Sequence, residues 1–350
     1  MKRFLLNCFL TLILLAAWAA GVFYLQYQKA LNAPLVAEGD GIITVKRGDT
    51  LASLNRELVQ RGVIHSDWVL PVYARLNPQA ANIKAGDYRI DASASLPSLM
   101  NDITNGKVVV YNITVVEGKT FKDLRASLVQ TAGIEHTLND KTDAQIATLL
   151  GIDGSPEGWF MPETYQFHRG SSDLELLKRM YGEMQRTLEQ EWPNRADGLP
   201  LANPYQALTL ASILEKETGV ASERPQIAGV FVRRLQKDML LQTDPSVIYG
   251  LGEAFDGNLR KRDLTADTPY NTYTRPGLPP TPIAMPGLAS LRAALHPEDD
   301  PALYFVARGD GSSHFSQTLE EHSQAVNRYQ RGRREVPSAP AQQGSNEGKP

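Results

Sequence analysis

Cysteine is nearly missing from this sequence, because its 350 residues contain only one, Cys8. A single thiol can form neither an intrachain disulfide nor a Cys-rich zinc site, and this one lies within the apolar N-terminal run. Basic residues never form a block, since the 36 Lys and Arg residues contain no run of five and are outnumbered by 39 Asp and Glu residues. We therefore expect no nucleic acid partner, because such a partner needs a broad basic surface.

Three kinds of catalytic motif are absent as well. The six histidines form no H-E-x-x-H pair, the nucleophile elbow G-x-S-x-G does not occur, and neither G-x-G-x-x-G nor a P-loop pattern is found. The sequence therefore predicts no catalytic metal, no serine hydrolase chemistry and no nucleotide cofactor. Carboxylate chemistry is the class that remains open.

The composition is that of a folded chain. Apolar residues make up 42% of it and charged residues 21%, which is enough to build a sizeable core. The length exceeds a typical domain of roughly 100–150 residues, so it favours two domains or one large domain with attachments. Helical and strand patterns both occur, and the sequence predicts a mixed α+β fold.

The longest apolar run lies at the N-terminus. Residues 4–28 contain no charged side chain, and residues 4–25 would measure about 33 Å as a helix, against a hydrocarbon core of roughly 30 Å. Lys2 and Arg3 precede this run, so the positive-inside rule places the N-terminus in the cytoplasm and the rest of the chain across the membrane. We predict a single-pass transmembrane anchor over residues 1–29, and a cleavable signal peptide is the alternative.

A linker and a small domain are predicted next, over residues 30–41 and 42–107. In the small domain a strand, a turn, two helical stretches and a closing strand follow one another. The string V-K-R-G-D-T-L-A-S-L (45–54) resembles the start of a LysM module, a β-α-α-β fold that grips N-acetylglucosamine. The resemblance implies glycan binding, and a purely structural spacer is the alternative.

Residues 108–335 are predicted to form the larger, mixed α+β domain. A β-branched run over residues 108–116 indicates its first strand, and helical patterns follow as far as residue 237. The stretch from about residue 240 to 315 is rich in Pro and Gly, which indicates loops with short strands. Residues 336–350 are mostly Ser, Ala, Pro, Gln, Gly and Asn, which predicts a disordered tail.

The segment from Asn203 to Gly219 has the start and stop residues of a helix. Asn203 can cap it, Pro204 suits its first turn, and Gly219 suits its end. One face carries an apolar stripe made of Ala207, Leu210 and Leu214. The next position on that face is Glu217, and burial of a carboxyl group raises its pKa, which suits a general acid.

A second glutamate, Glu215, lies two positions before Glu217 and follows a smaller apolar stripe. Two solvated glutamates in the last turn of a helix are the plain alternative, and the dipole of a helix does not favour anions at its C-terminus. Spacing alone therefore leaves the choice among these interpretations open.

The chain also contains several distinctive longer strings. One surrounds the two glutamates, L-A-S-I-L-E-K-E-T-G-V-A-S-E-R (210–224). The others are E-G-W-F-M-P-E-T-Y (157–165), L-Q-T-D-P-S-V-I-Y-G (241–250), Y-N-T-Y (270–273), G-L-P-P-T-P-I-A-M-P-G (277–287), Y-F-V-A (304–307) and G-S-S-H-F-S-Q-T-L-E-E-H (311–322). Together they resemble the YceG-like family of endolytic murein transglycosylases, from the N-terminal anchor to about Tyr329.

The resemblance implies a lyase of the inner membrane, with its catalytic domain in the periplasm. It would cut nascent peptidoglycan strands between N-acetylmuramic acid and N-acetylglucosamine and so end their elongation. In the family the second glutamate of E-K-E-T is catalytic, which is Glu217 here. That residue would protonate the glycosidic oxygen and then deprotonate the muramic acid 6-hydroxyl, which closes a 1,6-anhydro ring.

Because the substrate supplies its own nucleophile, the resemblance implies no second catalytic acid, no metal and no cofactor. A peptidoglycan synthase is the protein partner that the family leads one to expect. The alternative function is a non-catalytic peptidoglycan-binding scaffold of the wall-synthesis machinery.

Other residues of the matching strings are predicted to shape the site. Polar groups suited to sugar hydroxyls and acetamides are carried by Gln242, Thr243, Asp244 and Asn271. Rings that could stack on sugar faces are those of Tyr249, Tyr270 and Tyr273, with core packing as the alternative. Glu157 and Glu163 are secondary carboxylate candidates.

Overall fold

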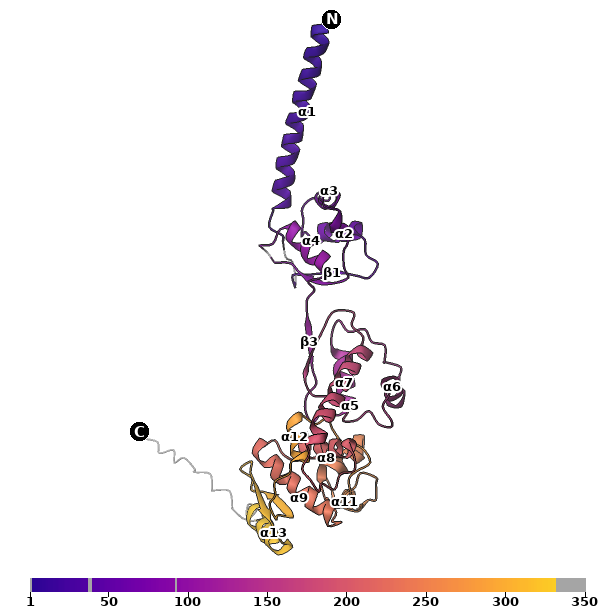
Figure 1. Cartoon of the computed structure of the whole chain (residues 1–350), viewed down its shortest axis with the longest axis vertical. Helices are drawn as coiled ribbons and strands as arrows, with labels where there is room; N and C mark the ends of the chain where they lie inside the picture. The colour runs from indigo at the N-terminus through magenta and orange to yellow at the C-terminus, as the bar shows by residue number, and fades with distance from the viewer. Residues whose placement is uncertain (1, 37–39, 92, 332–350) are drawn as a thin grey trace, which may run out of the picture. The chain divides into compact units, whose positions relative to one another are not determined.

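The structure is a computed structural model that describes residues 2–36, 40–91 and 93–331 (Figure 1). The predicted tail, residues 336–350, lies outside the described residues. The fold is mixed α+β, as predicted, and the strands among the described residues form three two-stranded sheets with the orders β1-β2, β3-β4 and β5-β6.

The chain divides into two compact units, which we call unit 1 and unit 2. Unit 1 consists of Met1–Ile113, Thr131–Glu135 and Gln166–Ser172. Unit 2 consists of Thr114–Gln130, His136–Tyr165 and Asp173–Pro350. Each unit has its own cluster of buried apolar side chains.

Helix α1 (Lys2–Leu31) contains 30 residues. Its segment Arg3–Leu31 is long enough and apolar enough to cross a membrane, and the most apolar part of it is not buried against the rest of the described chain. A helix of this length measures about 45 Å, which exceeds a hydrocarbon core of roughly 30 Å. The length and composition of α1 therefore agree with a membrane anchor.

The end of α1 and the segment after it pack into the core of unit 1. The side chain of Tyr27 is buried there, and Leu35 is 4% exposed. The backbone N–H of Leu35 donates to the carbonyl of Ala94 at 2.9 Å. The segment predicted as a linker over residues 30–41 is thus packed at Leu35, because its first part is apolar and its side chains join the core of unit 1.

Short elements build the rest of unit 1. They are β1 (Ile42–Val45), α2 (Leu51–Gln60), α3 (Val69–Leu76), η1 (Pro78–Ala81), β2 (Gly86–Arg89) and α4 (Leu96–Asn105). Strands β1 and β2 are antiparallel, and the buried residues Ile43 and Tyr88 lie opposite each other. Thr50 caps α2 by accepting a hydrogen bond from the N–H of Ser53 at 3.2 Å. The order of strand, two helices and strand is the one that the sequence predicts.

Asp87 on β2 is a buried carboxylate with three donors. It accepts hydrogen bonds from Thr44 Oγ1 at 2.7 Å, from Arg169 Nε at 2.5 Å and from the hydroxyl of Tyr111. Burial alone raises the pKa of Asp87, but these hydrogen bonds outweigh it and hold the pKa below its ordinary value. The ionised carboxylate therefore joins the sheet of unit 1 to two segments that are distant in the sequence.

Unit 2 holds most of the helices. Its elements are α5 (Phe121–Gln130), α6 (Asp143–Leu150), α7 (Asp173–Glu191), η2 (Trp192–Asn194), α8 (Pro204–Glu217), η3 (Ala221–Glu223), α9 (Arg224–Gln236), α10 (Asp244–Leu251), η4 (Gly252–Ala254), α11 (Lys261–Thr265), α12 (Leu288–Leu295), β5 (Tyr304–Ala307), β6 (Ser313–Ser316), α13 (Leu319–Val326) and η5 (Asn327–Arg331). Strands β3 (Tyr111–Thr114) and β4 (Thr164–Phe167) pair where the chain divides. The strand predicted over residues 108–116 is thus shorter in the structure.

The stretch from residue 240 to 315 differs from its prediction. It contains the helices α10, α11 and α12 in addition to the strands β5 and β6. Pro245 lies in the first turn of α10, where a missing N–H does no harm, and Gly287 directly precedes α12. Proline and glycine mark helix starts here, so their abundance does not exclude helices.

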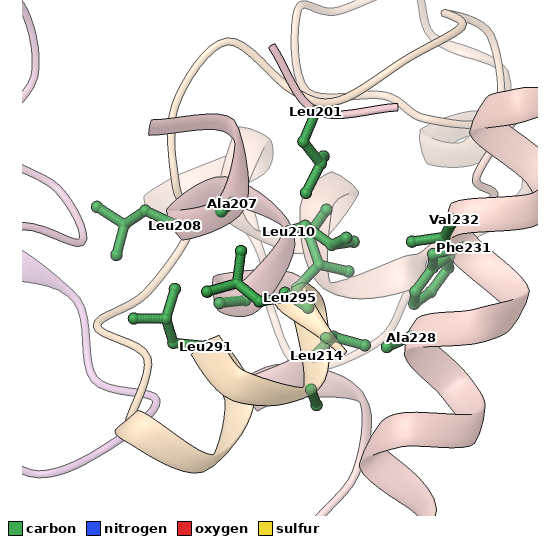
Figure 2. Packing of buried hydrophobic residues seen from close by; sticks show 14 of the residues in the cluster. Leu201, Ala207, Leu208, Leu210, Leu214, Ala228, Phe231, Val232, Leu291 and Leu295 are labelled. Carbon is green, nitrogen blue, oxygen red and sulfur yellow. The ribbon is translucent and has the colours of Figure 1, made fainter. Parts of the chain in front are cut away.

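The core of unit 2 surrounds α8 (Figure 2). Every residue of this helix from Ala207 to Leu214 is buried. Leu291 and Leu295 of α12 and Phe231 of α9 belong to the same cluster. A helix that is buried on all sides in its middle meets solvent only at its ends, so the fold presents the end of α8 as a surface feature.

Candidate active site

Glu217 is the last residue of α8. The helix begins as predicted, because the side chain of Asn203 accepts a hydrogen bond from the N–H of Gln206 at 3.0 Å and Pro204 lies in the first turn. It ends one residue before the predicted glycine cap, since Thr218 is already extended with φ −143° and ψ 135°. Glu217 itself is partly exposed. Its carboxyl group therefore lies where the buried helix reaches the surface.

The carboxylate of Glu217 contacts the residue that precedes α10. Thr243 is 1% exposed, and its hydroxyl donates a hydrogen bond to Oε1 of Glu217. The N–H of Thr243 donates to the hydroxyl of Thr272 at 3.0 Å, and the N–H of Gln242 donates to the carbonyl of Thr272 at 3.0 Å. Gln242 has φ 54°, a left-handed conformation that costs a non-glycine residue roughly 1–3 kcal/mol. The hydrogen bonds to Thr272 hold this turn and aim Thr243 at Glu217.

Burial is the main reason why the pKa of Glu217 is raised to about 7. The hydrogen bond from Thr243 opposes this shift, and the negative charge of Asp244 adds to it. Near neutral pH the carboxyl group is therefore present in both its protonated and its ionised form. A group in this state can give a proton in one step and take one in the next.

Asp244 and Tyr273 form a second contact of the site. The hydroxyl of Tyr273 donates to Oδ1 of Asp244, the first residue of α10, at 2.6 Å. Burial first, and then the hydrogen bond and charge of Asp244, raise the pKa of Tyr273, so its hydroxyl keeps its proton. The charge of Glu217 also acts on Tyr273. The structure thus brings four of the predicted residues together, namely Glu217, Thr243, Asp244 and Tyr273.

Arg234 is a residue of this region that the sequence analysis misses. It is a buried cation on α9, and it donates to the carbonyls of Leu303 at 2.7 Å and Leu241 at 2.9 Å. Its Nη1 also lies 3.4 Å from Oε1 of Gln242, whose side chain is otherwise exposed. Arg234 thereby holds the segment that leads into the strained turn. The sequence gives one hint of it, since two arginines interrupt an otherwise apolar helix end in A-G-V-F-V-R-R-L-Q.

Asn271 and Tyr249 have other partners than the predicted ones. The buried Nδ2 of Asn271 donates to the carbonyls of Asp263, Leu264 and Ala266, at 3.2, 3.1 and 2.6 Å. Its Oδ1 accepts from the N–H of Tyr273 at 2.9 Å, so the amide braces the loop that carries Tyr273. Tyr249 lies edge-to-face with Tyr270 at 5.0 Å, and its hydroxyl donates to Glu157 at 3.2 Å.

Glu157 is a buried carboxyl group that is 4% exposed. Its two oxygens accept from the N–H of Phe121 at 3.0 and 3.2 Å, and burial raises its pKa to about 7 despite these bonds. The group is therefore held at the start of α5 and is closed to solvent. Glu163, the other secondary candidate, is exposed and directly precedes β4.

Glu215 is tied to the framework of unit 2. Its Oε2 accepts from the N–H of Gly287 at 3.0 Å and from the hydroxyl of Ser290 at 2.7 Å. Its Oε1 lies 3.3 Å from Arg224, and both side chains are largely buried. Glu215 therefore links α8 to the start of α12, which separates its environment from that of Glu217. Among the described residues, no group of three or more His, Cys, Asp or Glu side chains lies close enough to hold a metal ion.

A surface pocket of about 400 Å³ lies at the other end of α8. Tyr205, Gln206 and Thr209 of the helix line it on one side, and Pro279 and Pro280 line it on another. The start of the proline-rich segment, residues 277–280, thus forms a wall of a concave surface.

These features define an α+β protein whose candidate site is built on one carboxyl group with a pKa near neutrality. The chain belongs to the YceG-like family, whose sequence profile matches residues 43–328.

The relatives of this chain cover most of its length. An endolytic murein transglycosylase of Bacillus subtilis (strain 168) is 30% identical over 324 residues, which cover 87% of this chain and 89% of the relative. One of Streptococcus pneumoniae serotype 2 is 26% identical over 361 residues, which cover 93% of this chain and 65% of the longer relative. The crystal structure of a yceG-like protein from Listeria monocytogenes is similar with a TM-score of 0.50 and 28% identity, over 81% of this chain and 98% of that one.

Proposed function

We propose that this chain is an endolytic murein transglycosylase, a lyase that cleaves glycan strands of peptidoglycan between N-acetylmuramic acid and N-acetylglucosamine. Its relatives in Bacillus subtilis and Streptococcus pneumoniae bear that name, and the similarity extends over most of the chain. The observation that supports the mechanism is the partly exposed carboxyl group of Glu217, whose pKa of about 7 suits an acid that must next act as a base.

The proposed reaction uses this one carboxyl group twice. Protonated Glu217 gives its proton to the glycosidic oxygen, the bond from that oxygen to C1 of the muramic acid breaks, and positive charge develops at C1. Ionised Glu217 then takes the proton of the 6-hydroxyl of the same sugar while O6 bonds to C1. The products are a 1,6-anhydro end and a new 4-hydroxyl end, and Glu217 is protonated again. The nucleophile is part of the substrate and is already in place, so no water enters the bond.

The neighbours of Glu217 receive different parts in this proposal. Thr243 and Asp244 set the proton affinity of the acid, and Tyr273 and Gln242 are exposed enough to contact sugar hydroxyls or acetamides. Asn271 and Tyr249 act behind the surface, because their polar groups are engaged by backbone carbonyls and by a buried carboxylate.

The anchor and the small domain are also part of the proposal. We place α1 in the inner membrane with the N-terminus in the cytoplasm and unit 2 in the periplasm, next to newly made strands and a peptidoglycan synthase. The strand, helix, helix, strand order of residues 42–107 supports a LysM-like domain that holds the glycan. In this scheme the catalytic domain spans residues 108–335.

The test is mass spectrometry of the products that the full-length chain releases from isolated peptidoglycan. Glu217→Gln keeps the size and shape of the side chain but cannot transfer the proton. Glu163→Gln is the matched control, because it removes an exposed carboxyl group from the same unit. We expect anhydro-muramic ends from the wild type and from Glu163→Gln, and none from Glu217→Gln.

Other outcomes point to other functions. Reducing ends would mean a hydrolase, which requires a second carboxylate for water. If Glu217→Gln forms anhydro ends at the wild-type rate, Glu217 is not the catalytic acid. Glycan binding without any product from the wild type, on nascent strands as well as on isolated peptidoglycan, would favour the scaffold function.

A further inference from the structure

Helices α1 and α3 of unit 1 meet through aromatic rings. The centroid of the Trp68 ring lies 5.4 Å from that of Phe23 and 6.3 Å from that of Tyr27. Trp68 directly precedes α3, so these contacts fix the start of α3 against the last part of α1. The position of α3 relative to the anchor is therefore set by packing within unit 1.

The sequence of α1 gives the depth of this contact in a bilayer. Phe4 begins the uncharged run, and Phe23 follows 19 residues later, which is about 29 Å along the helix. With Phe4 at one boundary of a hydrocarbon core of roughly 30 Å, Phe23 reaches the other boundary, and Tyr27 lies about 6 Å beyond it. Trp68 contacts both rings, so it lies within the headgroup layer, which is roughly 5–8 Å deep on each side.

The two faces of α3 differ in composition. Val69 and Leu70 are buried in the core of unit 1. Positions of α3 at the spacing i, i+3, i+4, i+7 and i+8 include its exposed residues, and we call them the α3 surface; they are Trp68, Pro71, Val72, Arg75 and Leu76, of which Trp68 and Val72 are partly buried and also pack against the core of unit 1. Leu76 is 65% exposed, and Arg75 and Pro71 are exposed as well.

We propose that the α3 surface is a second membrane contact, which lies in the headgroup layer beside the point where α1 leaves the bilayer. The proposal rests on the proposed anchoring of α1. Its chemistry is that of an interface: an indole ring is favoured at headgroup depth, Leu76 offers an exposed apolar side chain, and Arg75 can extend to lipid phosphates. We infer that the α3 surface contacts lipid, because the aromatic contact of Trp68 with α1 places this surface at the depth of the lipid headgroups.

The test uses fluorescence quenching by brominated lipids in vesicles that contain the full-length chain. The four tryptophans are replaced by Phe except for one reporter at a time. Trp18 reports on the apolar part of α1, and Trp68 reports on the start of the α3 surface. Leu76→Trp in a background without other tryptophans places a third reporter on that surface. Leu319→Trp is its matched control, because Leu319 is 63% exposed in unit 2, close to the 65% of Leu76.

We expect Trp68 and the Leu76→Trp reporter to lose fluorescence with lipids brominated near the headgroup. Trp18 should lose fluorescence with lipids brominated deep in their acyl chains. The Leu319→Trp reporter should lose fluorescence with neither kind of brominated lipid. Quenching of Trp18 without quenching at position 76 would overturn the inference and leave the anchor in place. Loss of quenching at Trp18 as well would remove the anchor and the inference together. If the Leu76→Trp reporter is quenched neither by brominated lipid nor by aqueous acrylamide, protein covers the α3 surface. That result would also overturn the inference.

Discussion

The hydroxyl of Thr243 donates a hydrogen bond to Oε1 of Glu217, so the residue that precedes α10 acts on the charge of the residue that ends α8. This bond favours the ionised carboxylate, whereas burial and the charge of Asp244 favour the protonated one. The pKa of about 7 is the balance of these effects. Each neighbour of Glu217 can therefore be changed to shift that balance in a known direction.

Thr243→Val should move the pH dependence of the reaction upward. The substitution keeps the shape of a buried side chain but removes the donor, and a hydrogen bond to a charged group contributes about 1.5–3 kcal/mol. The pKa of Glu217 then rises by about one unit or more, and the alkaline limb of the rate against pH moves up with it. The measurement is the rate of anhydro-product formation from pH 5 to 10. Thr243→Ser keeps the hydroxyl, so its alkaline limb should lie at the same pH as that of the wild type. If the alkaline limbs of Thr243→Val and Thr243→Ser lie at the same pH, the hydrogen bond does not set the pKa of Glu217.

Asp244→Asn should shift the same limb in the opposite direction. It removes a negative charge that favours protonated Glu217, while the amide oxygen can still accept the hydrogen bond from Tyr273. The pKa of Glu217 falls, so less of the acid form is present above neutral pH and the alkaline limb moves down. The same pH series measures it. A limb that moves upward would show that Asp244 acts through the geometry of Tyr273 and not through its charge.

Glu215→Gln should lower stability and leave the chemistry intact. The change leaves the largely buried Arg224 without its counter-charge, which costs about 1–3 kcal/mol of unfolding free energy. Urea unfolding followed by circular dichroism measures it. Glu253→Gln is the matched control, because Glu253 pairs with Lys122 on the surface and its removal should not shift the midpoint. If the Glu215→Gln variant is as stable as the wild type but forms no anhydro products, Glu215 and not Glu217 would be the catalytic residue.

Local patterns in the sequence were sufficient to predict α8, although the helix ends one residue before the predicted glycine cap. An N-cap, a proline in the first turn and an apolar stripe fix the helix and put Glu217 at its exposed end, since all three act within a few residues. The choice between Glu215 and Glu217 lies beyond such patterns. It depends on Gly287 and Ser290, which are more than 70 positions away and take up the carboxylate of Glu215.

The supporting contacts of the site are of this long-range kind as well. Tyr249 was predicted either to stack on a sugar or to pack in the core, and its hydroxyl reaches Glu157, 92 positions earlier in the chain. Asn271 has the right amide for an acetamide, yet three backbone carbonyls at the end of α11 accept hydrogen bonds from its donor group. The residue type determines which groups a side chain can bind, whereas the fold determines which of those groups lie within its reach.

The raised pKa of Glu217 also links the stability of unit 2 to pH. Folded Glu217 has a pKa of about 7, above the ordinary value of 4.5, so the folded state holds the proton more tightly than the unfolded state does. This stabilising contribution is complete below pH 4.5 and is lost as pH rises through 7. A shift of this size corresponds to at most about 3–4 kcal/mol, and solvent access to the carboxylate reduces it to about 1–3 kcal/mol.

Glu217→Gln should therefore be more stable than the wild type at pH 8 to 9, because the glutamine stays neutral while the glutamate ionises. This difference in stability should disappear toward pH 4.5. Urea unfolding at intervals of one pH unit measures the difference in free energy. The wild-type curve also contains the titration of Glu157, whose pKa is raised to about 7 as well, so only the difference between the two proteins isolates Glu217. Glu163→Gln should parallel the wild type. If Glu217→Gln is more stable than the wild type by the same free energy at every pH, the difference is a packing effect. The pKa of Glu217 would then not be raised as the mechanism requires.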